Sequence, residues 1–118
     1  MATTTESQRL QRCIKDCQEC TTACLRTASH CLGMGGDHAS PEHQTLLQDC
    51  AHLCGTAAGF MSRGSRHHGS VCHACAEICQ ACADDCDRLA EDDETMQRCA
   101  QACRRCAESC EKMATTSV

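Results

Sequence analysis

The chain has little of the material from which protein cores are usually built. Phe60 is the only aromatic residue among 118, and tryptophan and tyrosine are missing. No apolar run approaches the roughly 18 residues that a transmembrane helix needs, which predicts that the chain has no membrane partner. The net charge of −5 leaves no surplus of basic side chains for phosphate groups, which excludes a nucleic-acid partner.

Cysteine is the residue that the chain has in excess, with 16 copies. Most of them follow one another at alternating steps of three and four residues, the spacing that puts side chains on one stripe of a helix. A free cysteine packs as a small hydrophobic residue and also offers a soft sulfur ligand. The positions, all of which are predicted metal ligands, are Cys13, Cys17, Cys20, Cys24, Cys31, Cys50, Cys54, Cys72, Cys75, Cys79, Cys82, Cys86, Cys99, Cys103, Cys106 and Cys110.

These stripes predict four amphipathic helices. We expect them at about residues 6–32, from 41 to about 62, from the segment 65–70 to about 90, and from 92 or 93 to about 113. Thr5 and Gln8 form a predicted capping box for the first helix, and Pro41 opens the second after Ser40. Short links between long helices favour antiparallel neighbours. Residues 1–118 are therefore predicted to form one domain, an all-α, antiparallel up-down four-helix bundle with a cysteine-lined core.

The redox state of the thiols decides what they can bind. The sequence starts without the basic and apolar segments of a signal peptide, so we expect a cytoplasmic protein in a reducing compartment. Cysteines on one helix stripe have Cβ atoms roughly 5–6 Å apart. A disulfide needs about 3.5–4.5 Å, so bridges within a stripe are excluded and only bridges between helices remain as an alternative.

Thiolates select Cu(I), Zn(II) or iron–sulfur clusters, and the spacing favours copper. Cys-x3-Cys pairs recur in all four expected helices, and each pair matches a linear sulfur–copper–sulfur unit. With thiolates bridging between helices, the core is predicted to hold multiple Cu(I) ions, on the order of one per cysteine. Zinc sites are discrete and tetrahedral, and a zinc-thiolate structured interaction module remains the alternative function. Iron–sulfur clusters are disfavoured because Cys72, Cys75 and Cys79 depart from a C-x2-C-x2-C run.

Two further explanations of the cysteine stripes are disfavoured. Simple packing accounts for one or two buried cysteines, but not for 16 in a chain with hardly any valine or isoleucine. A thiol oxidoreductase needs one low-pKa cysteine in an exposed, electropositive site, and no cysteine stands apart from the stripes. We therefore predict that the chain is not an enzyme.

Extending the stripes past the cysteines places other side chains at the two ends of the predicted core. One end gathers Leu10, Met61, His68 and Met113, and the other gathers Met34, His43, Leu89 and Met96. The first end carries one loop and both chain termini, against two loops at the other, and we predict it to be the wider mouth. Methionine and histidine can pass Cu(I) to thiolate, which binds it more strongly. The predicted ligands at this mouth are Met61, His67, His68, His73 and Met113. His43 ranks below them, and His30, His38 and His52 are given no role.

The expected second helix differs from the others because it has only two cysteines and a face of small residues. These are Ala51, Gly55, Ala58 and Gly59. A face without large side chains permits close backbone approach, either to another subunit or to a helix of the same monomer. Both alternatives remain open.

The three densest cysteine rows, at residues 13–20, 72–79 and 99–106, resemble those of the copper storage proteins, a bacterial family of cysteine-lined four-helix bundles. The resemblance covers nearly the whole chain, and the lack of an export signal is similar to the cytosolic branch. It implies a store of many Cu(I) ions that forms a homotetramer of bundles and exchanges copper with donor or acceptor proteins. It also implies that methionine and histidine at one end of the core form the uptake route.

Overall fold

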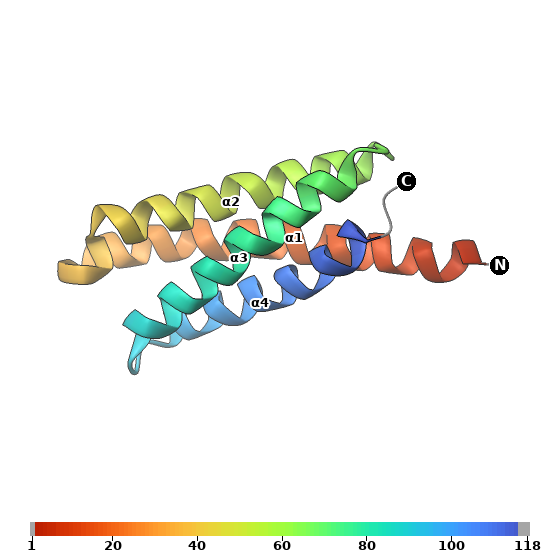
Figure 1. Ribbon diagram of the computed structural model, residues 1–118. Helices are drawn as coiled ribbons and strands as arrows, with labels where there is room; N and C mark the ends of the chain where they lie inside the picture. Colours follow the sequence, from red (N-terminus) through yellow and green to blue (C-terminus); the bar gives the residue numbers. More distant parts are fainter. Residues whose placement is uncertain (1, 116–118) are drawn as a thin grey trace.

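The protein is a bundle of four long helices (Figure 1). The computed structural model describes the backbone of residues 2–115 and the side chains of residues 5–115. The helices are α1 (Ala2–Met34), α2 (Pro41–Ser62), α3 (His68–Ala90) and α4 (Glu94–Ala114), and a 3-10 helix, η1 (Gly36–Ala39), joins the first two. Consecutive helices pack together, and α1 also packs against α4, which closes the ring. The predicted all-α, antiparallel up-down four-helix bundle is confirmed.

The connections give the bundle two different ends, which lie on opposite sides in Figure 1. The termini end carries the start of α1, the end of α4 and the link between α2 and α3. The loop end carries η1, between α1 and α2, and the turn between α3 and α4. The two ends therefore differ in which backbone segments cover the interior, as the order of the predicted helices requires.

Two of the helix starts are fixed by the caps that their sequences encode. The Ser40 hydroxyl accepts a hydrogen bond from the amide of His43, at 3.2 Å, and Pro41 follows at the first helical position. The Asp93 carboxylate accepts a hydrogen bond from the amide of Met96, at 2.9 Å. Both caps stand at the loop end, so they also fix the start of the turns that carry His43 and Met96.

The predicted capping box at Thr5 and Gln8 is wrong, because α1 begins at Ala2 and passes through both residues. An N-cap residue has non-helical backbone angles, which a residue inside a helix does not have. Threonine has a weak helix propensity but costs at most about 0.7 kcal/mol per residue, so it does not stop a helix that other residues favour. The first helix is therefore longer at both ends than the sequence predicts.

The turn between α3 and α4 contains the one strained backbone position among the described residues. Glu91 has a φ of 47°, in the left-handed region where a side chain is unfavourable. Its carbonyl accepts a hydrogen bond from the Gln97 side chain at 2.9 Å, which ties the turn to the first part of α4. This turn therefore holds the start of α4 close to the end of α3 at the loop end.

The interior is lined with sulfur. All 16 cysteines have an exposed fraction of 1% or less, and alanine, leucine and methionine, with Thr27 and His43, fill most of the remaining buried positions. Met34 is a correction, because its side chain is 47% exposed and does not reach the core. It is the last residue of α1, so no further turn of that helix follows it. Within residues 2–115, no helix is both long and apolar enough to cross a membrane.

Polar contacts between helices fix how far each helix is shifted along its neighbour. Thr21 and Gln44 donate hydrogen bonds to the carbonyls of Ala51 and Ala28, at 3.2 Å and 3.0 Å, which joins α1 to α2. Arg104 on α4 forms ion pairs with Asp84 and Asp87 on α3. Because a shift by one residue would break these contacts, they help to keep the cysteine rows level across the bundle.

Candidate metal centre

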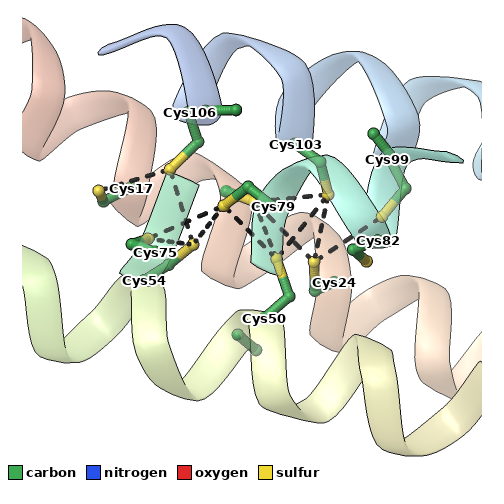
Figure 2. Close-up of a cluster of buried hydrophobic side chains, with 14 of the residues drawn as sticks. Cys17, Cys24, Cys50, Cys54, Cys75, Cys79, Cys82, Cys99, Cys103 and Cys106 are labelled. Carbon is green, nitrogen blue, oxygen red and sulfur yellow. Dashed lines mark hydrogen bonds between the residues drawn. The ribbon is translucent and has the colours of Figure 1, made fainter. Parts of the chain in front are cut away.

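The thiols of the middle of the bundle face one another around a shared axis, as Figure 2 shows for side chains from all four helices. Neighbouring sulfur atoms lie between 3.4 Å, for Cys54 and Cys79, and 4.0 Å, for Cys50 and Cys103. All 16 cysteines are free thiols, so the alternative of disulfides between helices is wrong. Two sulfur ligands of one tetrahedral metal ion, at a bond length of about 2.3 Å, lie roughly 3.8 Å apart. The observed spacing is therefore that of metal ligands.

The thiols form groups that overlap along the bundle. Five groups have all their sulfur atoms within 4.8 Å of one another. They are Cys13–Cys72–Cys110, Cys17–Cys75–Cys106–Cys110, Cys54–Cys75–Cys79–Cys106, Cys20–Cys50–Cys54–Cys79 and Cys20–Cys24–Cys50–Cys103. Because neighbouring groups share sulfur atoms, one thiolate can bridge two ions. Discrete zinc sites would instead need separate sets of four ligands.

Both cysteines of α2 lie where neighbouring groups share sulfur atoms. Cys50 contacts Cys20, Cys79 and Cys103, at 3.8, 3.7 and 4.0 Å. Cys54 contacts Cys75, Cys79 and Cys106, at 3.6, 3.4 and 3.6 Å. Cys50 thus contacts the cysteine rows of the other three helices, and Cys54 contacts those of α3 and α4. The helix with the fewest cysteines supplies two thiols with three sulfur contacts each.

The protonation state of the thiols sets the conditions under which metal binds. Burial, followed by the nearby Asp93 and Cys99, raises the pKa of Cys31 to about 11, from an ordinary value of 9.0. Contacts with Cys82 and Cys99, together with burial, raise the pKa of Cys86 above its ordinary range. These thiols keep their protons at neutral pH in the absence of metal. A bound metal ion therefore has to displace protons.

At the loop end the sulfur channel finishes in a site of mixed donors around Cys31. Its Sγ lies 3.1 Å from the Sδ of Met96, 3.5 Å from the Nε2 of His43 and 3.9 Å from the Nδ1 of His38. The His43 side chain is 1% exposed, and its Nδ1 donates to the Asp85 carboxylate at 2.6 Å. Because a carboxylate oxygen only accepts, Nδ1 carries a proton, and Nε2 is the ring nitrogen that faces Cys31. Thiol, thioether and imidazole groups from three helices are thus held together.

Two acidic residues stabilise this end. Burial opposes the ionisation of Asp85, but hydrogen bonds from His43 and Arg88 hold its pKa below its usual range. The Asp93 carboxylate is bonded to His30 Nε2 at 2.7 Å, and this hydrogen bond is the main reason why its pKa is also lowered. A carboxylate behind a histidine ligand fixes its tautomer and orientation in many metal sites.

At the termini end the structure separates the predicted ligands into two sets. Met61 and Met113 are buried, with exposed fractions of 1% and 5%, and His68 is half-buried. His67 is exposed, and His73 is 71% exposed and faces Glu77 at 3.6 Å. Of the predicted cluster of three histidines, only His68 therefore approaches the core.

The loop end holds three histidines that the sequence ranks low or gives no role. His43 lies on the predicted stripe, and it is the histidine in the closest contact with a core thiol. His30 and His38 also lie at this end, one hydrogen-bonded to Asp93 and the other near Cys31. A signal for His43 was its heptad position, seven residues before Cys50. No sequence signal identified Asp85 as its partner.

Comparison with known proteins agrees with this geometry. A model of the copper storage protein family matches residues 6–115. A crystal structure of a Nitrosospira multiformis protein shares 48% sequence identity at a TM-score of 0.87, covering 92% of this chain and 97% of that one.

Several of the similar structures contain copper. Cu(I)-bound copper storage protein 3 from Bacillus subtilis shares 34% identity at a TM-score of 0.83, over 90% of this chain and 98% of that one. A cytosolic copper storage protein from Streptomyces lividans with five coppers shares 32% identity at a TM-score of 0.83, over 92% and 93%. No curated protein sequence matches the chain.

Proposed function

The chain belongs to the copper storage protein family, whose members hold Cu(I) in a cysteine-lined bundle, and from this we propose how its own residues store the metal. The ions are held along the sulfur channel by the thiolates of all 16 cysteines, each thiolate serving one or two ions. The observation that carries the proposal is the overlap of the thiol groups, which gives a continuous row of sites in place of a few separate ones.

Loading is an exchange of protons for copper. Each incoming Cu(I) binds a thiol sulfur and releases its proton to solvent, so the charge of the ion is neutralised by the thiolate that it creates. This balance matters in the channel, because a buried row of unpaired charges would be costly. The amount of bound copper is therefore limited by the number of thiols that can lose a proton.

The ends of the channel pass copper between solvent and the thiolates. At the loop end, Met96, His43 and Cys31 form a graded set of donors in direct contact, which supports a transfer role there. At the termini end, the predicted ligands Met61, His68 and Met113 remain part of the proposal, because they lie at the mouth of the core. The role of His67 and His73 stays a prediction, and their exposure fits only a first contact with solvent copper.

The remaining features of the proposal concern the whole molecule. We propose that residues 1–118 form one storage domain, that it works in the cytoplasm, and that it is not an enzyme. A cytosolic copper storage protein among the similar structures supports the compartment. Copper donor and acceptor proteins are the expected partners.

We also propose that the protein forms a homotetramer. Its subunits would pack through the face of α2 that carries the glycines. Ala51 and Ala58 are buried within the monomer, whereas Gly55 is exposed in a shallow groove between α1 and α2. Half of the small face of α2 is thus used inside the monomer, and the other half remains available to a second copy.

Titration of the reduced, metal-free protein with Cu(I) in the presence of a competing chelator tests this function. We expect on the order of one tightly held Cu(I) per cysteine, with protons released in step in a weakly buffered solution. Zinc titrated in parallel serves as the control. Saturation at a few equivalents, with zinc held as firmly as copper, would instead support the zinc-thiolate module.

A further inference from the structure

The imidazole of His68 has an unusual environment at the termini end. Among the described residues, its Nε2 is the one buried side-chain nitrogen or oxygen without a hydrogen-bond partner. Its Nδ1 lies 2.9 Å from the carbonyl oxygen of Ser65. A buried polar atom without a partner destabilises the fold, so its presence at this place requires an explanation.

The contact with Ser65 determines where the proton is. A carbonyl oxygen can only accept, so Nδ1 carries the hydrogen and donates it. Nε2 is then the ring nitrogen left for another partner. In a neutral imidazole with its proton on Nδ1, the Nε2 lone pair is free, which is the form in which histidine binds metal ions.

The first cysteine of α3, Cys72, lies on the same face of the helix as His68. Cys72 follows His68 by four residues, so the two side chains are neighbours one turn apart. Cys72 also belongs to the outermost thiol group, with Cys13 and Cys110. That group does not include His68 Nε2 within its 4.8 Å limit, so an ion bound by the imidazole would sit at the outer edge of the group.

We propose that His68 Nε2 and the Cys72 thiolate hold a terminal Cu(I) ion, which closes the sulfur channel at the termini end. The inference rests on the proposed storage function and adds a resident ligand to it. Bond lengths of about 2.0 Å to nitrogen and 2.3 Å to sulfur let a linear unit span roughly 4.3 Å between the two atoms, which suits Cu(I). The ion replaces the Cys72 proton, and the imidazole stays neutral.

The donor set gives this site a distinct property. An imidazole holds Cu(I) less firmly than a second thiolate does, so the terminal ion exchanges faster than those in the middle of the channel. The backbone carbonyl of Ser65, in the link between α2 and α3, orients the ring. The site is thus suited to exchange with a chelator or with an acceptor protein.

Nitrogen-15 NMR of the labelled, full-length protein tests the proposal during titration with Cu(I). In the metal-free protein, the Nε2 of His68 should resonate as a bare pyridine-type nitrogen, and it should move to a metal-bound position at full loading. His52, which is exposed on α2, is the internal control and should not move. The His68→Gln variant assigns the signal, and we expect it to bind about one Cu(I) fewer than the wild type and than His52→Gln.

The outcomes separate the site from the function. If His68 stays at its metal-free position while the wild type takes up its full amount of copper, the terminal site is wrong and storage stands. If the wild type itself saturates at a few ions, the storage function is wrong, and the terminal site that rests on it is wrong as well. If His68→Gln does not fold, the His68 ring is assigned in the wild type by its correlations with the sequentially assigned backbone, and the wild-type titration then decides.

Discussion

The two ends of the sulfur channel contain the same kinds of donor but hold them differently. At the loop end, His43 is fixed by the charged Asp85 carboxylate and its Nε2 already faces the thiol of Cys31. At the termini end, His68 is fixed by a backbone carbonyl and its Nε2 has no partner. The first imidazole is part of a completed polar network, and the second leaves one atom of its network unsatisfied.

This difference shows how a bundle built from one repeating stripe acquires a direction. A ligand held by a carboxylate is preorganised and becomes a stronger base, so it binds metal with little rearrangement. Before it binds, however, the Cys31 thiol has to give up its contacts with His43 and Met96. The unsatisfied imidazole loses no hydrogen bond when it binds. We therefore expect the loop end to hold its ion more firmly and the termini end to exchange its ion more readily.

The comparison of the ends is meaningful only if the middle of the channel connects them, and removal of the α2 thiols would break that connection. In the double variant Cys50→Ala/Cys54→Ala, six sulfur–sulfur contacts are lost. Because these thiolates are shared between ions, we expect the capacity to fall by more than the roughly one Cu(I) per thiolate that independent sites would lose. Chelator competition at saturation measures the capacity.

The matched control removes two thiols from the termini end. Cys13→Ala/Cys72→Ala removes the same number of sulfur atoms. Among the described residues, it removes only one of the sulfur–sulfur contacts between 3.4 and 4.0 Å, that of Cys13 with Cys110 at 3.7 Å. We expect a smaller loss of capacity for this variant. Equal losses in the two variants would mean that the ions occupy independent sites, and the idea of a connected channel would then be wrong.

Asp85→Ala tests the loop end alone. The substitution leaves the buried Nδ1 of His43 without its acceptor, so we expect the metal-free protein to lose about 1.5–3 kcal/mol of stability in urea unfolding. The orientation of the ring is lost as well, and the affinity of the loop-end site for Cu(I) should fall about 10–100-fold.

Asp84→Ala is the control for this variant, because Asp84 is the preceding residue and forms an exposed pair with Arg104. Its loss should cost less than about 1 kcal/mol and leave copper affinity unchanged. If the two variants are equally stable and bind copper equally, Asp85 does not position His43 for binding. The Asp85 carboxylate could then not explain the firmer copper binding expected at the loop end.

Much of the core was predictable from the sequence, because the heptad spacing of cysteine predicts both the helix and the face that it buries. The same spacing placed Cys31, His43 and Met96 on the stripe. It failed at Met34, where the helix ends before another turn can cover the side chain. Periodicity describes one helix at a time, so it is least reliable where neighbouring helices no longer surround a residue.

The contacts that distinguish the two ends were not predictable. Asp85 lies on α3, 42 residues from His43 on α2, and nothing in the local sequence marks it as a partner. His67, His68 and His73 are close together in the sequence, yet only one of the three approaches the core. Which of several neighbouring histidines turns inward depends on where α3 begins, and helix boundaries are the least certain part of a sequence-based assignment.

The smallest expected effect is a difference in how the two ends respond to acid. Hydrogen bonds from His30 and from the Met96 amide lower the pKa of Asp93 below its ordinary value of 3.8. A carboxyl group with a lowered pKa in the folded state stabilises the fold above its unfolded pKa, and this contribution is lost as the pH falls through the folded pKa. The cap of α4 should therefore survive acidification to below pH 3.8.

The amide resonance of Met96, followed by NMR in the metal-free protein, should titrate with a midpoint under this value. In His30→Gln the midpoint should rise toward it, while the amide of Cys72, at the other end, should respond to neither change. A wild-type midpoint at or above 3.8 would show that His30 does not stabilise the carboxylate, and that the loop end owes its order to Asp85 alone.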